Sequence, residues 1–228
     1  MGLLIVSDTL FADISEYQDA QPDARYPYKF ISIRANDGTF RDKQFPIRLA
    51  WCLTALQLRK LVGFLVYTVF EENWEQATAV FKIQYGAKHI QRSAVVIDVE
   101  RWKGRITGDH SPMVNSMREA IIAYLYALRP AWQRSVFFRA YFRAQDRKRV
   151  VLYGNAGDLA ELSPHRGDAK IIIANYSFNP SFPGKIAHQF SDHYWCPPFG
   201  YVDMNSADGY SPWQFARALG MGTLRRTL

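Results

Sequence analysis

The sequence lacks several features that would assign the chain to a narrower class of protein. It has only two cysteines, Cys52 and Cys196, which lie far apart and cannot form a metal knuckle. A disulfide between them is neither required nor excluded, and unpaired thiols fit synthesis in a reducing cytoplasm. No apolar run is long enough to cross a membrane, and the apolar start over residues 1–6 is too short for a signal-peptide core. We therefore expect no signal peptide and no membrane partner.

Acidic residues are the scarcer charged class, with 21 Asp and Glu against 28 Lys and Arg, which gives a formal charge of +7. A basic protein is attracted to polyanions such as nucleic acid, anionic lipid or bacterial wall polymers, and charge alone does not choose among them. Basic residues are dense only over 139–149, which we interpret as a solvated helix face. No basic run interleaved with aromatics resembles a nucleic-acid module, so we expect no nucleic-acid partner.

The pattern that is present is an alternation of short apolar runs with helical stretches. Continuous apolar runs are typical of strands that are buried on both faces of a parallel sheet. Predicted strands cover 11–15, 30–35, 63–70, 94–100, 150–154, 170–176 and 186–190. Predicted helices cover 47–61, 71–85 and 132–144 and begin after Ser111-Pro112 and Ser211-Pro212, while 179–209 is interpreted as long loops.

This alternation indicates an α/β protein built from βα units. The length of 228 residues favours closure into one irregular (β/α) barrel, similar to a TIM barrel, over an open sheet. We expect residues 1–228 to form a single catalytic domain, since neither an internal repeat nor a linker interrupts the sequence.

Carboxylates follow several of the predicted strands. Asp13 ends the first, Asp98 and Glu100 end the fourth, and Asp203 follows a short apolar pair. Residues two apart on a strand face the same side, so Asp98 and Glu100 should project together while Val99 faces the packed side. Strands of a βα barrel carry catalytic residues at their carboxyl ends, so the four acids should converge there.

Converging carboxylates suit glycosidic cleavage. That reaction needs one protonated carboxyl to donate to the leaving oxygen and negative charge near the oxocarbenium-like centre. Neighbouring negative charge raises the pKa of a carboxyl and keeps it protonated. Alternative interpretations remain open at this point, because Asp at strand ends also serves in turns, in helix caps or as a ligand of divalent metals.

Ordered motifs around these acids are similar to those of glycoside hydrolase family 25, the Chalaropsis-type muramidases that are common among phage endolysins. The resemblance extends over nearly the whole chain. Its segments, in order, are Ala12-Asp13-Ile14-Ser15-Glu16-Tyr17-Gln18, residues 30–39, Gly63-Phe64-Leu65-Val66-Tyr67, Val96-Ile97-Asp98-Val99-Glu100, Val151-Leu152-Tyr153, Ile173-Ala174-Asn175-Tyr176, His188-Gln189-Phe190 and Val202-Asp203-Met204-Asn205.

The resemblance implies a peptidoglycan hydrolase, a lysozyme that cleaves the β-1,4 bond between N-acetylmuramic acid and N-acetylglucosamine. By the match, Glu100 would be the general acid and Asp98 would assist by orienting or stabilising the substrate's N-acetyl group, with Asp13 and Asp203 completing an acidic floor. No cofactor and no metal are implied. The substrate-binding candidates are Tyr67, Tyr153, Tyr176, Gln189, Trp102 and Trp195.

The resemblance also implies a setting and a partner. Bacterial peptidoglycan would be the partner of a monomeric enzyme that accumulates in the cytoplasm of an infected host and reaches the cell wall through a holin-type lesion. Two other functions remain: a wall-binding barrel without catalysis, and a hydrolase of another N-acetylated glycan such as chitin. Three positions depart from the family pattern and are expected to alter the lining of the cleft, namely Thr68, Ile172 and His188.

Overall fold

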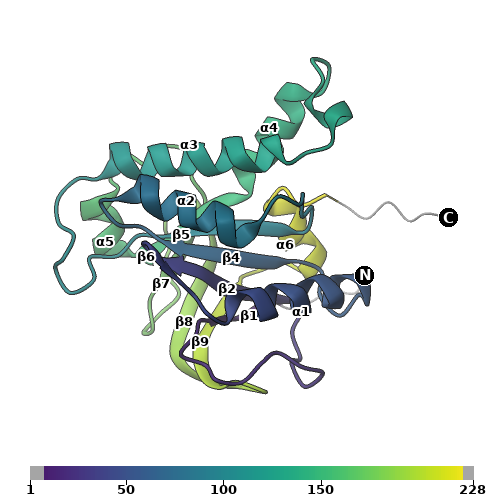
Figure 1. The fold of residues 1–228 in the computed structure, drawn as a ribbon. Coiled ribbons are helices and arrows are strands. Elements are labelled where there is room, and N and C mark those ends of the chain that lie inside the picture. Colours follow the sequence, from purple (N-terminus) through teal and green to yellow (C-terminus); the bar gives the residue numbers. More distant parts are fainter. Residues whose placement is uncertain (1–7, 223–228) are drawn as a thin grey trace, which may run out of the picture.

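A closed barrel of eight strands forms the centre of the molecule (Figure 1). The computed structural model describes residues 8–222, so the apolar start over residues 1–6 lies outside the described residues. The barrel strands are β1 (Thr9–Ile14), β2 (Phe30–Asp37), β4 (Phe64–Val69), β5 (Ser93–Asp98), β6 (Val150–Asn155), β7 (Ile171–Ala174), β8 (Lys185–Cys196) and β9 (Gly200–Ala207), and β3 (Phe40–Arg41) adds a short strand to β2.

Strand direction makes the barrel irregular. Neighbours are parallel from β1 through β2, β4, β5, β6 and β7 to β8, whereas β9 runs antiparallel to both β8 and β1 and closes the ring. Each of the seven predicted strands overlaps an observed one, and the predicted irregular (β/α) barrel is confirmed.

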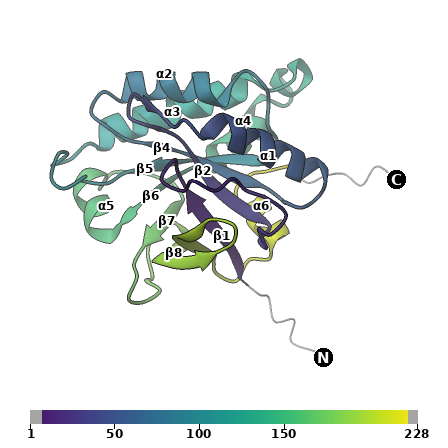
Figure 2. The same ribbon diagram turned by 60° about the horizontal axis from the view of Figure 1, so that its bottom comes forward.

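Helices surround the barrel unevenly. α2 and α3 lie side by side along one flank (Figures 1 and 2). Within residues 8–222, no helix links β1 to β2 or β7 to β8, and no helix is long and apolar enough to cross a bilayer. The helices are α1 (Phe45–Gln57), α2 (Trp74–Tyr85), α3 (Ser111–Ala127), the 3₁₀ helix η1 (Ala131–Arg134), α4 (Arg139–Lys148), α5 (Ala156–Leu162) and α6 (Pro212–Ala218).

The hydrophobic core has two parts, one between the strands and the outer helices and one inside the barrel. Because side chains alternate along a strand, every second residue of β1 and β2 points inward, beginning with Phe11 and Phe30. α6 closes this inner core, since the ring of Phe215 lies 5.6 Å from that of Phe11 and 5.0 Å from that of Phe30. The apolar base leaves the opposite end of the barrel for polar side chains.

Two predicted features are wrong. Residues 179–209 are not mainly loop, because β8 and β9 form a long antiparallel hairpin there. The helix predicted over 132–144 is broken, because Ser135 has an extended backbone (ψ 160°) that separates η1 from α4. α5 was not predicted. It is capped by Asn155, the residue before its first turn, whose side chain accepts a hydrogen bond from the backbone N–H of Asp158.

Candidate active site

A polar pocket of about 190 Å³ lies at the end of the barrel opposite α6. It follows from strand alternation, because the inward positions that are apolar near the base become polar two or four residues further on. Its lining residues are Asp13, Ser15, Tyr17, Arg34, Asp37, Tyr67, Val69, Val96, Asp98, Glu100, Trp102, Tyr153, Gln189 and Asp203.

Asp98 and Glu100 both line this pocket, whereas Val99 between them is fully buried in the outer core. This is the arrangement that their spacing predicted. Strand β5 ends at Asp98, and the ladder continues for one step because the backbone N–H of Val99 donates to the carbonyl of Tyr153 at 2.9 Å. Glu100 thus leaves the sheet at a fixed point, and its carboxyl lies beside that of Asp98.

Asp13 and Asp203 are partners across the pair formed by β1 and β9. The sequence suggested that each acid ends a strand, and for Asp203 this is wrong, because it lies within β9. β9 runs opposite to β1, so its first half lies next to the last residues of β1. The reversed strand therefore brings a fourth carboxyl to the same pocket.

Burial and mutual repulsion hold protons on these carboxyls. Desolvation raises the pKa of Glu100 to about 7, and the charges of Asp158 and Asp203 add to the shift. Desolvation and, to a smaller extent, the negative charge of Asp192 raise the pKa of Asp203 to about 6. The pocket therefore contains carboxyls that titrate near neutral pH.

Asp98 and Asp13 are displaced further in the same direction. Desolvation raises the pKa of Asp98 well above its usual range, and the charge of Glu100 is the next cause. The pKa of Asp13 is likewise raised by burial and by Asp203, although the nearby hydroxyl of Ser32 and the guanidinium of Arg34 oppose the shift.

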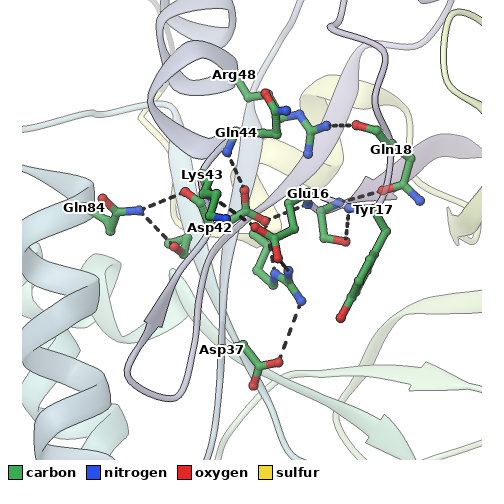
Figure 3. A network of polar contacts seen from close by, with 12 residues as sticks. Glu16, Tyr17, Gln18, Asp37, Asp42, Lys43, Gln44, Arg48 and Gln84 are labelled. Atoms are coloured by element: carbon green, nitrogen blue, oxygen red, sulfur yellow. Dashed lines mark hydrogen bonds and ion pairs between the residues drawn. The ribbon is translucent and has the colours of Figure 1, made fainter.

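Arg34 brings a buried cation to this acidic pocket and was missed as a site residue by the sequence analysis. Its Nε donates to Asp42 Oδ2 at 3.1 Å, and its other nitrogens lie 3.6 Å from Glu16 and 3.8 Å from Asp37. Figure 3 shows these three carboxylates converging from separate stretches of chain, and the guanidinium lies 5.1 Å from the centre of the Tyr17 ring. A charged residue at an inward position of an apolar strand was the available signal, because Arg34 shares its face of β2 with Phe30.

Polar and aromatic groups complete the wall. Tyr153 Oη donates to Gln189 Oε1 at 2.6 Å, and Tyr176 Oη donates to the same oxygen at 3.0 Å. Trp102 follows Glu100 in a left-handed backbone conformation (φ 47°), which is strained for a residue with a side chain. Trp102 lines the pocket and also packs against the outer core.

The structure brings together eight of the ten predicted site residues: Asp13, Tyr67, Asp98, Glu100, Trp102, Tyr153, Gln189 and Asp203 all line the pocket. Tyr176 is half-exposed and reaches the wall only through Gln189, while Trp195 is 63% exposed on the β8–β9 hairpin, against Tyr201. Binding roles for these two stay predictions.

The three departures from the family pattern do not line this pocket, so the expected change in its lining is wrong. Thr68 is fully buried, and Ile172 belongs to the inner core of the barrel. His188 is buried as well, with Nε2 at 2.6 Å from the backbone oxygen of Asn175. As to the metal-site alternative, the part of the chain from 8 to 222 holds no group of three or more His, Cys, Asp or Glu side chains placed to bind one ion.

Comparison with known proteins adds one sequence relative. No protein-family model matches the chain. The uncharacterized protein Rv3766 of Mycobacterium tuberculosis is 34% identical over 229 residues, a match that covers 96% of this chain and 76% of the relative. This chain belongs to the family of Rv3766. The charge, fold and acidic pocket described above are those of one member of this family.

Solved structures define the fold of this Rv3766-family protein. A family 25 glycosyl hydrolase of Bacillus anthracis matches with a TM-score of 0.62 at 18% identity, over 95% of each chain. The CTP1L endolysin matches with a TM-score of 0.66 at 19% identity, over 92% of this chain and 69% of its own. A lysozyme of Streptomyces coelicolor matches with a TM-score of 0.54 at 17% identity, over 95% and 99%. The fold is therefore that of the family 25 glycosyl hydrolases.

Proposed function

We propose that this protein is a peptidoglycan hydrolase that cleaves the β-1,4 bond between N-acetylmuramic acid and N-acetylglucosamine. The observation that carries the proposal is the gathering of Asp13, Asp98, Glu100 and Asp203 in one pocket, with a pKa of about 7 at Glu100. A carboxyl that holds its proton near neutral pH is what a glycosidase needs as general acid. Structural neighbours named as a lysozyme and an endolysin support this choice of substrate.

Glu100 has the role of proton donor to the leaving glycosidic oxygen. It fits because it is the most accessible member of the Asp98/Glu100 pair, at the edge of the pocket rather than inside the sheet. Asp98 lies deeper and assists at the reaction centre, by orienting or stabilising the N-acetyl group of the substrate. Asp13 and Asp203 form the acidic floor of the pocket. Asp203, with a pKa of about 6, is mostly ionised at neutral pH and is the member of this pair that steadies positive charge developing at the sugar ring.

Tyr67, Tyr153, Gln189 and Trp102 have the role of binding the sugar. Trp102, which lines the pocket, supplies apolar surface for a sugar ring, and the Tyr153–Gln189 pair supplies hydrogen-bonding groups that are held in place by their mutual contact. A wall-binding barrel without catalysis is less favoured, because all four carboxyls of the motif are present in one pocket. A hydrolase of another N-acetylated glycan differs only in product and is separated by the experiment below.

The decisive experiment is digestion of purified peptidoglycan followed by mass analysis of the new reducing ends. New reducing N-acetylmuramic acid is the expected product. Reducing N-acetylglucosamine, or release from chitin in place of peptidoglycan, would overturn the proposed bond, and no release from either polymer would leave the wall-binding alternative.

Two substitutions assign the roles within the same assay. Glu100→Gln keeps size and hydrogen bonding but removes the donated proton, so the rate should fall by about 10²-fold or more while the fold is kept. Asp98→Asn should cause a severe but smaller loss. Glu119→Gln is the matched control and should keep full activity. Glu119 lies on α3 and forms an exposed ion pair with Arg147 of α4. Normal turnover by Glu100→Gln would show that another carboxyl donates the proton.

A further inference from the structure

The segment of residues 131–148, here called the η1–α4 arm, stands away from the barrel beyond the end of α3 (Figure 1). Most of its side chains from Arg134 to Ala144 are exposed. The acidic pocket does not include any residue of the arm. The role of the residues of this arm is therefore separate from that of the acidic pocket.

Large apolar side chains cover the arm. Phe137 is 88% exposed and Val136 is 75% exposed at the turn between η1 and α4. Behind this tip the ring of Trp132 contacts those of Phe138 and Phe142, with centroids 6.1 and 5.7 Å apart. The aromatic cluster is thus already assembled, whereas Phe137 takes part in no aromatic pair within residues 8–222 and both tip residues are mostly exposed. Exposed apolar groups gathered in this way are typical of an interaction site.

The arm is rich in basic residues, and Arg134 and Arg139 flank the apolar tip in the sequence. The arm contains five basic residues, namely Arg134, Arg139, Arg143, Arg147 and Lys148, and one acidic residue, Asp146. Asp146 is fully buried and is bound by Arg129 and Arg149, so it does not offset the charge that the arm presents to its surroundings. A partner with negative charge and an apolar layer would match both features.

The base of the arm is firmly held. Two nitrogens of Arg129 donate to the two oxygens of Asp146, at 2.6 and 2.8 Å, and its guanidinium carbon lies 4.7 Å from the centre of the Phe142 ring. Arg149 adds a bond to the same carboxylate at 3.0 Å. A rigid base keeps the tip pointing outward, which lowers the entropic cost of docking.

We propose that the η1–α4 arm docks on the surface of an anionic lipid bilayer, with Val136 and Phe137 inserted below the headgroups and the arginines on lipid phosphates. Helices that lie in a membrane interface combine an apolar aromatic face with Lys and Arg on the polar face. The proposal departs from the sequence-based interpretation of 139–149 as a solvated helix face and from the expectation of no membrane partner. The proposal does not depend on the hydrolase function, because the two sites share no residue.

Other occupants fit the arm less well. A hydrophilic wall polymer would satisfy the arginines but would leave Phe137 in water. A second copy of the chain would bring two positively charged arms together, which repel each other. A bilayer of anionic lipid supplies phosphate and hydrocarbon within a few ångströms of each other, so both halves of the arm are used.

The test is co-sedimentation of the full chain with vesicles of phosphatidylcholine alone, or of equal parts phosphatidylcholine and phosphatidylglycerol. We expect binding to the anionic vesicles that weakens as salt is raised. Phe137→Ser should weaken partitioning by about tenfold or more, because a buried phenyl group is lost. Arg139→Glu/Arg143→Glu should weaken it by at least about tenfold.

Matched controls lie at the exposed end of α1. Leu58→Ser removes a side chain that is 63% exposed, and Arg59→Glu/Lys60→Glu makes the same change in net charge as the double variant of the arm. These controls, and Glu100→Gln, should sediment like the unchanged protein. Equal binding to both vesicle types, or equal losses in arm and control variants, would overturn the proposal. Self-association without vesicles that Phe137→Ser abolishes would replace it with a dimer contact.

Discussion

Glu100 lines two neighbouring pockets. On one side it lines the acidic pocket with Asp98, and on the other it lines a shallower depression with Arg101 and Asp158. Asp158 is buried, and it accepts hydrogen bonds from Arg101 Nε at 2.6 Å and from the Arg101 backbone N–H at 3.1 Å. Its charge is the largest cause after burial of the raised pKa of Glu100. A charge outside the acidic pocket thus adds to the effect of burial on the pKa of the proposed general acid.

This control predicts the pH dependence of the rate. A general acid works only when protonated, so kcat/KM should fall as the pH rises through about 7, the pKa of Glu100. Asp158→Asn removes a negative charge and should move this alkaline limb to lower pH. Glu161→Gln, which also loses a carboxylate bound to Arg101, is the matched control and should leave the limb in place. An unmoved limb in Asp158→Asn would mean that burial and Asp203 set the pKa without Asp158.

Helix α4 combines a buried ionic anchor with an exposed outer face. Asp146 near its end is fully buried and is bound by Arg129 and Arg149, and Arg149 also donates from Nε to the backbone oxygen of Ser93 at 2.8 Å. These bonds tie α4 to α3 and to the start of β5. One carboxylate therefore fixes the outer helix to the barrel.

Removal of this carboxylate should destabilise the protein strongly. Asp146→Ala leaves two buried guanidinium groups without a counter-charge, and breaking a buried ion pair in this way costs about 3–5 kcal/mol. The urea midpoint should fall accordingly, whereas Glu119→Gln, which breaks the exposed pair with Arg147, should change the stability by less than about 1 kcal/mol. Equal changes in the free energy of unfolding would show that the buried ion pair stabilises the protein no more than the exposed one.

The elements also show how far the sequence predicts this molecule. β5 was predicted because its buried residues form an apolar run before Asp98. The spacing of Asp98 and Glu100 then placed both carboxyls in one pocket. β9 was missed because its inward face is polar: Asp203 and Asn205 alternate with the outward Val202 and Met204, and the strand lacks the apolar run on which the prediction depended.

Long-range contacts were beyond prediction for a different reason. Asp37 lies only three residues from Arg34, but Glu16 and Asp42 come from other segments, and no spacing rule states that these segments will meet at one guanidinium. The antiparallel direction of β9, which places Asp203 beside Asp13, is likewise a property of the closed barrel and not of the local sequence.

For the whole molecule, the acidic pocket is a source of instability at neutral pH. Burial raises the pKa values of Asp13, Asp98, Glu100 and Asp203 together, and the unfolded chain carries no such shift. A carboxyl whose pKa is raised by folding adds stability below its unfolded pKa, and that contribution is lost as the pH rises through the folded value. The four carboxyls should therefore lower the free energy of unfolding most at alkaline pH. This loss of stability accompanies their raised pKa values.

Asp98→Asn tests this penalty directly. Asp98 Oδ1 is buried and finds no hydrogen-bond partner among residues 8–222, so an amide in its place should remove a desolvated charge at little cost in contacts. At pH 8 the variant should be more stable than the unchanged protein by about 0.5–2 kcal/mol, a typical gain when a functional site is relieved. For a chain of this length, each kcal/mol raises Tm by about 2–4 °C. The gain should shrink as the pH falls and should vanish below the ordinary pKa of an aspartate, where Asp98 is protonated in the folded and the unfolded chain.

The matched control is Asp23→Asn. At this surface position Arg25 binds the carboxylate and lowers its pKa, so the substitution should not raise Tm at any pH. A lower Tm for Asp98→Asn at pH 8 would mean that the ionised carboxylate is stabilised in the folded protein, and that the site retains its charge through favourable contacts and not against the cost of burial.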